Sequence, residues 1–334
     1  MSGNGMVKQG NVGVVAQSTW DTFPTSGYVS SKYNSSTVPA FENAPSLEAR
    51  EVMGDASVTS AVDRSYFDGL GNLKSMPFET YLNSGSLGMH LNAALQDATI
   101  STASGYKPEG SVIDFQANEG TVYSIHKKWS SGQRFSIYNA VLDSLNFSLD
   151  NTATGLAQLM TMGGSWMGSR IQAIFDPSIT DATSEYIVAD VNAGASLNKW
   201  YLTWFDGTTT FTDTCFYSFG LDIANSVEGT CKGEGYFRNF RIKPVLTVNF
   251  LVPLGTGNAG TLSNSMVGTE MTFTLRNYSG LGDPVSAGQI KFNADKMICN
   301  AAIDADHNGY EALNIQAEIL EPTTGWTDVV TYYK

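Results

Sequence analysis

Between Phe135 and Asp150 most apolar residues share one parity and most polar residues the other, and this pattern constrains the fold more than any other feature. Side chains of a β-strand point to opposite faces in turn, so the segment predicts a strand with one buried and one wet face. At sixteen residues it far exceeds the common ~5–6 residues. We therefore expect a bend or bulge near Asn139 or Asp143.

Five further segments alternate in the same way and are separated by clusters of Gly, Asn and Asp, as in antiparallel sheets. One segment departs from this pattern: Leu87, Leu91, Ala94 and Leu95 line one face of a short helix, with Ser86 as its expected N-cap. The sequence thus predicts a mainly β fold, with sandwich-like or barrel-like antiparallel sheets and one short flanking α-helix. The alternating segments are 123–129, 246–250, 271–276, 313–319 and 329–333.

The domain organisation is predicted in two parts. Residues 1–48 are rich in Gly, Ser, Thr, Asn and Pro and indicate an extended N-terminal arm, whereas residues 49–334 form the β domain. Within that domain, 176–240 looks irregular and is interpreted as an insertion or an elaborated loop and hairpin. The arm carries Trp20, Phe23 and Tyr28, which a free tail has no reason to keep. We expect them to dock on a neighbour, or alternatively to pack on their own domain.

Charge excludes some classes of function. Of 334 residues only 15% are charged, and the formal net charge is −13, so neither a disordered polyelectrolyte nor a protein that grips phosphates by mass charge is expected. No run of ~20 apolar residues and no signal-peptide core is present, which predicts no membrane association. Three cysteines are best interpreted as buried thiols of a protein made in a reducing cytoplasm.

No motif predicts catalysis, a metal or a cofactor, and we expect no enzyme. The three histidines, at positions 90, 126 and 307, stand far apart. Residues 304–309 begin like a calcium loop, but Ile315 occupies the position of the bidentate Glu, which favours an Asn-Gly turn between two strands. The basic and aromatic residues of 236–243 divide between the two faces of a strand, unlike a nucleic-acid platform.

A family resemblance rests on the order of several segments. Arg50–Thr59 precedes a loop with Tyr66, Phe67 and Gly69, and residues 72–79 lead into the helix with Leu91-Asn92-Ala93-Ala94-Leu95. A strand pair follows, from Tyr123-Ser124-Ile125 to the run 138–149. This order resembles the tail tube (major tail) proteins of long-tailed bacteriophages. The resemblance covers roughly residues 50–170 and extends less clearly to 245–334, while 176–240 does not align.

The resemblance implies that subunits join their sheets side by side into hexameric rings, which stack into a tube. The partners implied are other copies of the chain, the tape measure, tail terminator and distal tail proteins, and DNA in transient passage. The location implied is the virion, after synthesis in the host cytoplasm. The expected contacts between subunits or rings are Trp20, Phe23, Tyr28, Tyr66, Phe67 and Leu70.

Other classes stay open at this point. An all-β glycan-binding module would stack sugars on Trp200, Trp204 or Trp326, although most tryptophans are buried. A tail terminator or capsid decoration protein would use similar strands but assemble only once. A β-sandwich hydrolase working through carboxylates has no specific support.

Overall fold

The structure is a computed structural model of the chain. It describes residues 11–17, 20, 24–31, 74–96, 103–108, 113–114, 120–128, 134–154, 159–172, 178–180, 200–233, 236–254 and 267–333. Within these residues the protein is mainly β, with antiparallel sheets, one α-helix and no closed barrel, which confirms the predicted fold class.

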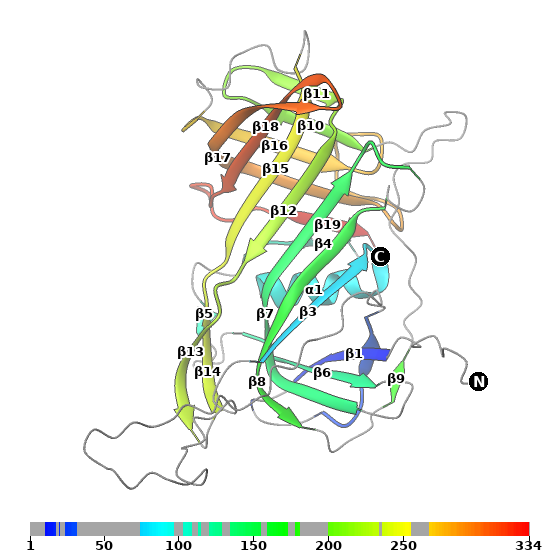
Figure 1. The fold of residues 1–334 in the computed structure, drawn as a ribbon, viewed down its shortest axis with the longest axis vertical. Coiled ribbons are helices and arrows are strands. Elements are labelled where there is room, and N and C mark those ends of the chain that lie inside the picture. The colour runs from blue at the N-terminus through cyan, green and yellow to red at the C-terminus, as the bar shows by residue number, and fades with distance from the viewer. Residues whose placement is uncertain are drawn as a thin grey trace, which may run out of the picture.

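Seven neighbouring antiparallel strands form a long sheet that dominates the molecule (Figure 1). A continuous row of paired residues crosses all seven: Phe78, Gly164, Leu145, Ile223, Leu246, Ile319 and Met297. The row shows that the seven strands are paired continuously across the sheet, although the register shifts elsewhere in the β7–β8 and β17–β18 pairs. In order, the strands are β3 (Lys74–Tyr81), β8 (Thr161–Gln172), β7 (Arg134–Asp150), β12 (Ser218–Ala224), β15 (Val245–Pro253), β18 (Tyr310–Ile319) and β17 (Ile290–His307).

A second layer packs against one end of this sheet. The first half of β17 leaves β18 and pairs with strands that continue away from the long sheet. Aromatic rings join the layers: Phe147 and Phe292 lie 5.2 Å apart between centroids, and Trp204 and Phe250 lie 5.6 Å apart. The strands of this layer are β16 (Glu270–Arg276), β10 (Tyr201–Phe205), β11 (Thr210–Thr214), β19 (Val330–Tyr333) and β4 (Ala103–Tyr106).

The other end of the molecule holds the remaining strands and the helix. Strand β6 continues the sheet from β7 to β1 and β2, and the short β9 pairs with β2 in parallel. A separate small sheet contains β13, β14 and β5. Their bounds are β6 (Tyr123–Lys128), β1 (Asn11–Ala16), β2 (Tyr28–Ser30), β9 (Ile179–Thr180), β13 (Glu228–Gly233), β14 (Tyr236–Ile242) and β5 (Ile113–Asp114).

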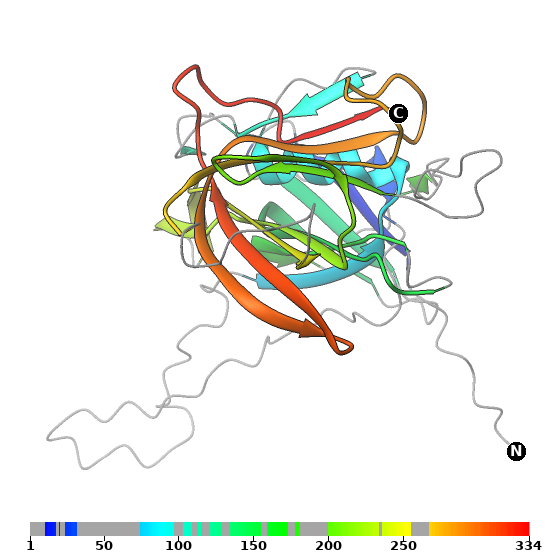
Figure 2. The ribbon, with the colours of Figure 1, turned by 90° about the horizontal axis from the view of Figure 1, so that it is seen from above.

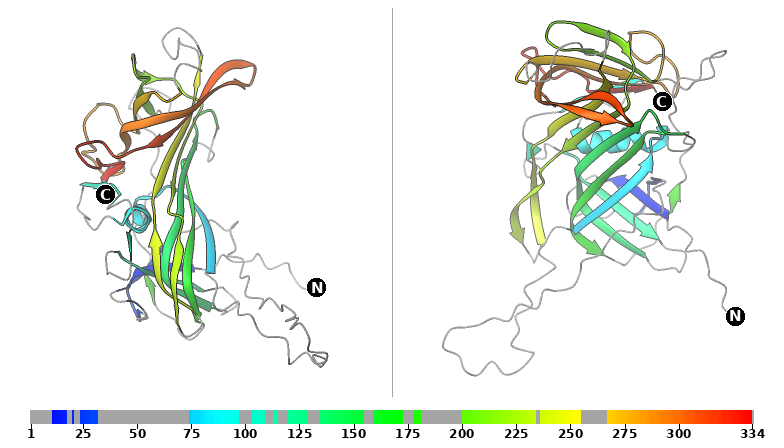
Figure 3. Two further views of the ribbon diagram at one scale, coloured as in Figure 1. Left: turned by 90° about the vertical axis from the view of Figure 1, so that its left-hand side faces the viewer. Right: turned by 45° about the horizontal axis from the view of Figure 1, so that its top comes forward.

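Helix α1 (Ser84–Leu95) lies behind the long sheet and contacts β7 (Figures 1 and 3). The four apolar residues that predicted it are all buried. The expected cap was wrong, because Asn83 is the N-cap: its Oδ1 accepts hydrogen bonds from the backbone N–H and the hydroxyl of Ser86. The helix ends at Gln96, whose φ of 58° is left-handed. Because helix α1 contacts β7 on the side of the core, it covers the apolar face of the long sheet and not the opposite face.

Both predicted irregularities of β7 are present, which confirms that expectation. Asn139 has a φ of 49°, and the register toward β6 shifts across it. The register toward β8 shifts between Leu142 and Ser144, so Asp143 is the extra residue there. Each bulge moves one more residue into the strand and changes which face the following side chains occupy. The full alternation of buried and exposed residues is therefore found only from Leu145 onward.

The domain prediction needs two corrections. Residues 11–17 and 28–31 are not an extended arm, because β1 and β2 pair within the sheet. Region 176–240 is not simply an insertion either: β12 lies between β7 and β15 in the middle of the long sheet, and of the described strands of this region β13 and β14 alone stand outside the large sheet. Within β12, Phe219, Leu221 and Ile223 alternate with Gly220 and Asp222, so the period-two pattern is present but short within a region of irregular composition.

Candidate assembly surface

The long sheet has one apolar face and one polar face. Residues such as Phe147, Phe219 and Phe250 point into the core, and their neighbours along each strand point the opposite way. We call this opposite set the polar face. It comprises Ser75, Pro77, Glu79, Tyr81; Thr161, Gly163, Ser165, Met167; Ser144, Asn146, Ser148, Asp150; Ser218, Gly220, Asp222, Ala224; Val245, Thr247, Asn249, Leu251; Asn314, Gln316, Glu318; and Ile303, Ala305, His307.

The polar-face residues named above include no lysine or arginine, but Lys296 of β17 lies at the margin of the same face, where its carbonyl accepts from the Leu320 N–H beside Val245. The carboxylates of the face are those of Glu79, Asp150, Asp222 and Glu318. A hydrogen bond from the Thr152 hydroxyl lowers the pKa of Asp150, and partial burial raises the pKa of Asp222. Away from this margin the face is thus wet, mostly uncharged, and negative where it is charged.

Small residues keep the polar face smooth. A Cβ at Gly163 would lie 2.6 Å from the Asn146 Oδ1, and one at Gly220 would lie 2.7 Å from the Asn249 amide. The asparagines therefore lie flat over neighbouring glycines. At the far end of β7 the small sheet closes this surface, where Phe240 and Ile242 cover Val141.

Among the described residues, the polar-faced sheet has two edges without a further strand. Strand β3 has β8 as its one partner there, and the backbones of Ser75, Pro77 and Glu79 point outward, since Pro77 has no N–H to give to the ladder. On the opposite side, the contact of β17 with the β16 segment ends at Cys299, and of the described strands β18 alone pairs with its last residues. No hydrogen bond within the described part of the chain occupies the outward backbone groups of Ala302, Asp304 or Asp306.

The β17–β18 hairpin extends past the end of β15 and projects from the molecule (Figure 2). Asn308 and Gly309 form its two-residue turn with φ of 54° and 84°, so the predicted Asn-Gly turn is confirmed. His307 stacks on Tyr217 at 4.2 Å between centroids, which anchors the ribbon. Ile303 and Tyr310 are 53% and 68% exposed, unusual for large apolar groups.

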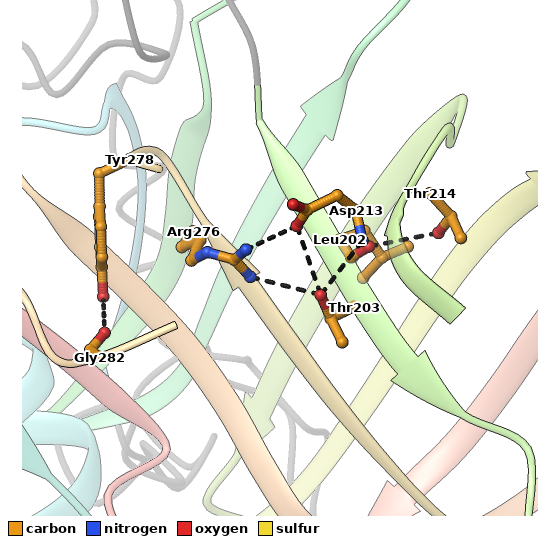
Figure 4. A network of polar contacts seen from close by, with 7 residues as sticks. All are labelled: Leu202, Thr203, Asp213, Thr214, Arg276, Tyr278 and Gly282. Atoms are coloured by element: carbon orange, nitrogen blue, oxygen red, sulfur yellow. Dashed lines mark hydrogen bonds and ion pairs between the residues drawn. The ribbon is translucent and has the colours of Figure 1, made fainter. Parts of the chain in front are cut away.

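An ion pair fixes the outermost strands of the second layer (Figure 4). Arg276 of β16 donates from Nη2 to Asp213 Oδ1 at 2.6 Å and from Nη1 to Thr203 Oγ1 at 3.4 Å. Its guanidinium also lies 5.5 Å from the ring centroid of Tyr201. Asp213 has a left-handed φ of 50° and sits where the β10–β11 register shifts. The pair therefore holds a strained edge hairpin.

The structure places two of the six predicted contact residues, and both contact their own chain. Tyr28 is fully buried, and its hydroxyl lies 2.8 Å from that of Ser124. Trp20 packs edge-on against Phe240 at 5.4 Å. In this conformation Tyr28 has no surface to offer a neighbour. Phe23, Tyr66, Phe67 and Leu70 lie outside the described residues, so their role stays a prediction.

The other sequence candidates are located as follows. Trp200 and Trp204 are 3% and 1% exposed and belong to the core, so neither offers a platform for sugars. His90 is buried under Phe78 and Trp166, and burial lowers its pKa to about 4. No group of three or more His, Cys, Asp or Glu gathers as metal ligands among the described residues.

Sequence reasoning found the alternation of the polar face but not its two edges. Edges depend on which strands pair, and pairing was not visible in the alternation alone.

No protein-family profile matches the chain, and the search of curated proteins found no match. None of the helices in the described part is long and apolar enough to cross a membrane.

Proposed function

We propose that this chain is a structural subunit of a bacteriophage tail tube, closing into rings that stack into a conduit for DNA. The observation that carries the proposal is the polar face: seven strands wide and uncharged or acidic over its described central rows, with Lys296 of β17 as a basic group at its margin. Basic groups bind DNA by releasing counterions from the phosphates. A wall that is poor in them lets a duplex pass without holding it.

The open edges give the second line of support. An unpaired edge invites pairing with another chain, and closure into a ring is one way to remove it. A head-to-tail ring contact is repeated by each subunit until it closes, and stacking of such rings gives a tube. Family resemblance supplies the expectation of six subunits per ring, and the tape measure, tail terminator and distal tail proteins as partners in the virion.

Electron microscopy of the purified chain tests this function. Negative-stain images over a series of rising concentrations are expected to show rings and then hollow tubes of uniform width. The wild-type tubes are also expected to retain no labelled duplex DNA at low salt. A monomer that stays monodisperse across salt and concentration would refute the proposal.

The alternatives fare differently. The glycan-binding alternative loses two of its three tryptophans, because Trp200 and Trp204 lie in the core, whereas Trp326 is only partly buried against it. A tail terminator or decoration protein would form one ring or one contact and then stop. The same concentration series separates these from a tube subunit, since only the latter lengthens.

A further inference from the structure

The polar face is bounded by β3 on one side and by the last residues of β17 on the other, and these two edge strands run in the same direction. Because every neighbouring pair from β3 to β17 is antiparallel, the first and the seventh strand run the same way. A second copy, rotated about an axis through the ring, would therefore present its β3 parallel to the last residues of β17. We propose that this parallel pairing joins successive copies, and that three copies close the ring in place of the six that the family resemblance implies; the inference rests on the proposed function.

The backbone groups of the two edges are complementary at their centres. With the midpoints aligned, the N–H of Asp304 meets the carbonyl of Pro77 on the next copy, and its carbonyl meets the N–H of Glu79. Pro77 lacks only a donor, and this register leaves its carbonyl in use. Because Pro77 has no N–H, one hydrogen bond of the ladder cannot form, and this keeps the β3 edge from pairing strongly with unrelated strands.

Side chains across this contact are compatible as well. The exposed Ile303 falls level with Pro77 of the next copy, so an apolar group leaves water. Ala305 falls level with Glu79, and His307 is the nearest ionisable group on the same face of β17. Asp304 and Asp306 point to the opposite face from Glu79, so no carboxylates stand directly opposite one another.

The stagger between the edges fits a closed barrel. Phe78 at the middle of β3 lies level with Met297, whereas the open stretch of β17 is centred about six residues further along, or about 20 Å at ~3.4 Å per residue. Seven strands at ~4.8 Å span about 34 Å. If the β17 edge of one copy joins the β3 edge of the next with this stagger, the ratio of about 20 Å to about 34 Å tilts the strands by about 30° to the ring axis. This is near the ~35–45° usual in barrels.

Strand count then sets the number of copies. Three copies give about 21 strands and a backbone diameter of about 37 Å at this tilt. Side chains take about 5 Å from each wall, half of the ~10 Å spacing of packed sheets, which leaves a bore of about 27 Å. By the same arithmetic two copies leave about 15 Å and six leave about 65 Å. A duplex, with grooves ~8 Å deep, is about 20 Å across, so three copies suit it.

Disulfide cross-linking tests both the edge and the number. Glu79→Cys with Ala305→Cys places two thiols on the same face of paired strands, within reach of a disulfide. Cys215, which is exposed, and Cys231 are replaced by Ser in every variant. The matched control, Glu79→Cys with Asp304→Cys, points its thiols to opposite faces. Non-reducing gels of oxidised, assembled protein are expected to show a ladder that ends at three chains, and the control none.

The outcomes separate this inference from the proposed function. A ladder that ends at six chains would overturn the ring of three while leaving the tube intact. Tubes by microscopy without any cross-link, or with equal cross-linking in the control, would overturn the β3–β17 contact. If wild-type protein forms neither rings nor tubes, the proposed function itself fails. End-on class averages of wild-type rings with threefold symmetry would support the number independently of the cysteines.

Discussion

Replacing Asp213 by Ala should destabilise the second layer, because the change leaves the buried guanidinium of Arg276 without its charged partner. Arg276 is 1% exposed, and Asp213 supplies its one charged partner within the described structure. In Asp213→Ala the guanidinium keeps only the long contact to Thr203 and the ring of Tyr201. Its Nε makes no hydrogen bond even in the intact protein. A buried cation would then remain without compensation.

The expected loss in the free energy of unfolding depends on how deeply Arg276 and Asp213 are each buried. Removing one partner of a fully buried ion pair costs ~3–5 kcal/mol. Asp213 is 38% exposed, so water reaches the vacated position, and we expect about 2 kcal/mol. Asp213→Asn keeps an acceptor oxygen and tolerates the left-handed φ, so about 1 kcal/mol is expected. Arg276→Met removes the cation itself and should cost little further in the Asp213→Ala background.

Urea denaturation at low protein concentration measures these differences, provided that the slope m stays unchanged. The four proteins of the cycle give the coupling between the two side chains directly. Equal losses for Asp213→Ala and Asp213→Asn would refute the argument from burial. So would an Arg276→Met change that destabilises the Asp213→Ala protein by as much as it destabilises the wild type.

Three further predictions concern the long sheet and its contents. In Gly164→Ala the new Cβ would lie 2.2 Å from the backbone oxygen of Ser144, so we expect a loss of about 3 kcal/mol in urea melts, against almost none for Gly282→Ala, where the space is open. His90 has a folded pKa of about 4, below the ~6.5 of an unfolded histidine. The free energy of unfolding that comes from keeping His90 neutral is therefore fully present above pH ~6.5 and is lost as the pH falls toward ~4. That difference amounts to about 3 kcal/mol, and His90→Gln should lack this part of the pH dependence; parallel pH profiles of the two proteins would contradict it. On the polar face, Ser148→Lys with Asn249→Lys should make tubes retain duplex DNA at low salt and release it at high salt, whereas Leu281→Lys on an exposed loop should leave the bore inert. Retention that is the same in both variants would show that the polar face does not line the bore.

The long strands were predictable because their signal is local. Leu246, Val248 and Phe250 alternate without interruption, and a strand is the one structure that buries all three on one side. The length of the 135–150 segment also predicted where it had to deviate, since few strands stay regular that long. Asn139 and Asp143 are residue types that tolerate such positions better than the apolar residues around them.

The errors came from features that depend on distant partners. Asn83 was passed over as the cap because Ser86 stands closer to the apolar stripe, although both are good caps. Tyr28 was expected at a surface, yet pairing of β2 with β1 turns it inward onto Ser124. Strand β12 does carry a period-two pattern, in Phe219, Leu221 and Ile223, but it is only seven residues long and the pattern does not show that the strand lies between β7 and β15. The partner of a strand or cap is not visible in the sequence pattern alone.

The distribution of charge links the fold to the proposed use. A chain with a net charge of −13 and only 15% charged residues has few groups with which to make a surface repel or attract. On the polar face the carboxylates stand apart, on β3, β7, β12 and β18, among serines and asparagines that hydrogen-bond to water. Clustered acids would bind cations and, through them, phosphates, whereas dispersed acids give a weak repulsion that is screened within a Debye length of ~10 Å. In the proposed tube, such a wall would act on a duplex only when the duplex comes close, and this would centre the duplex in the bore without slowing it.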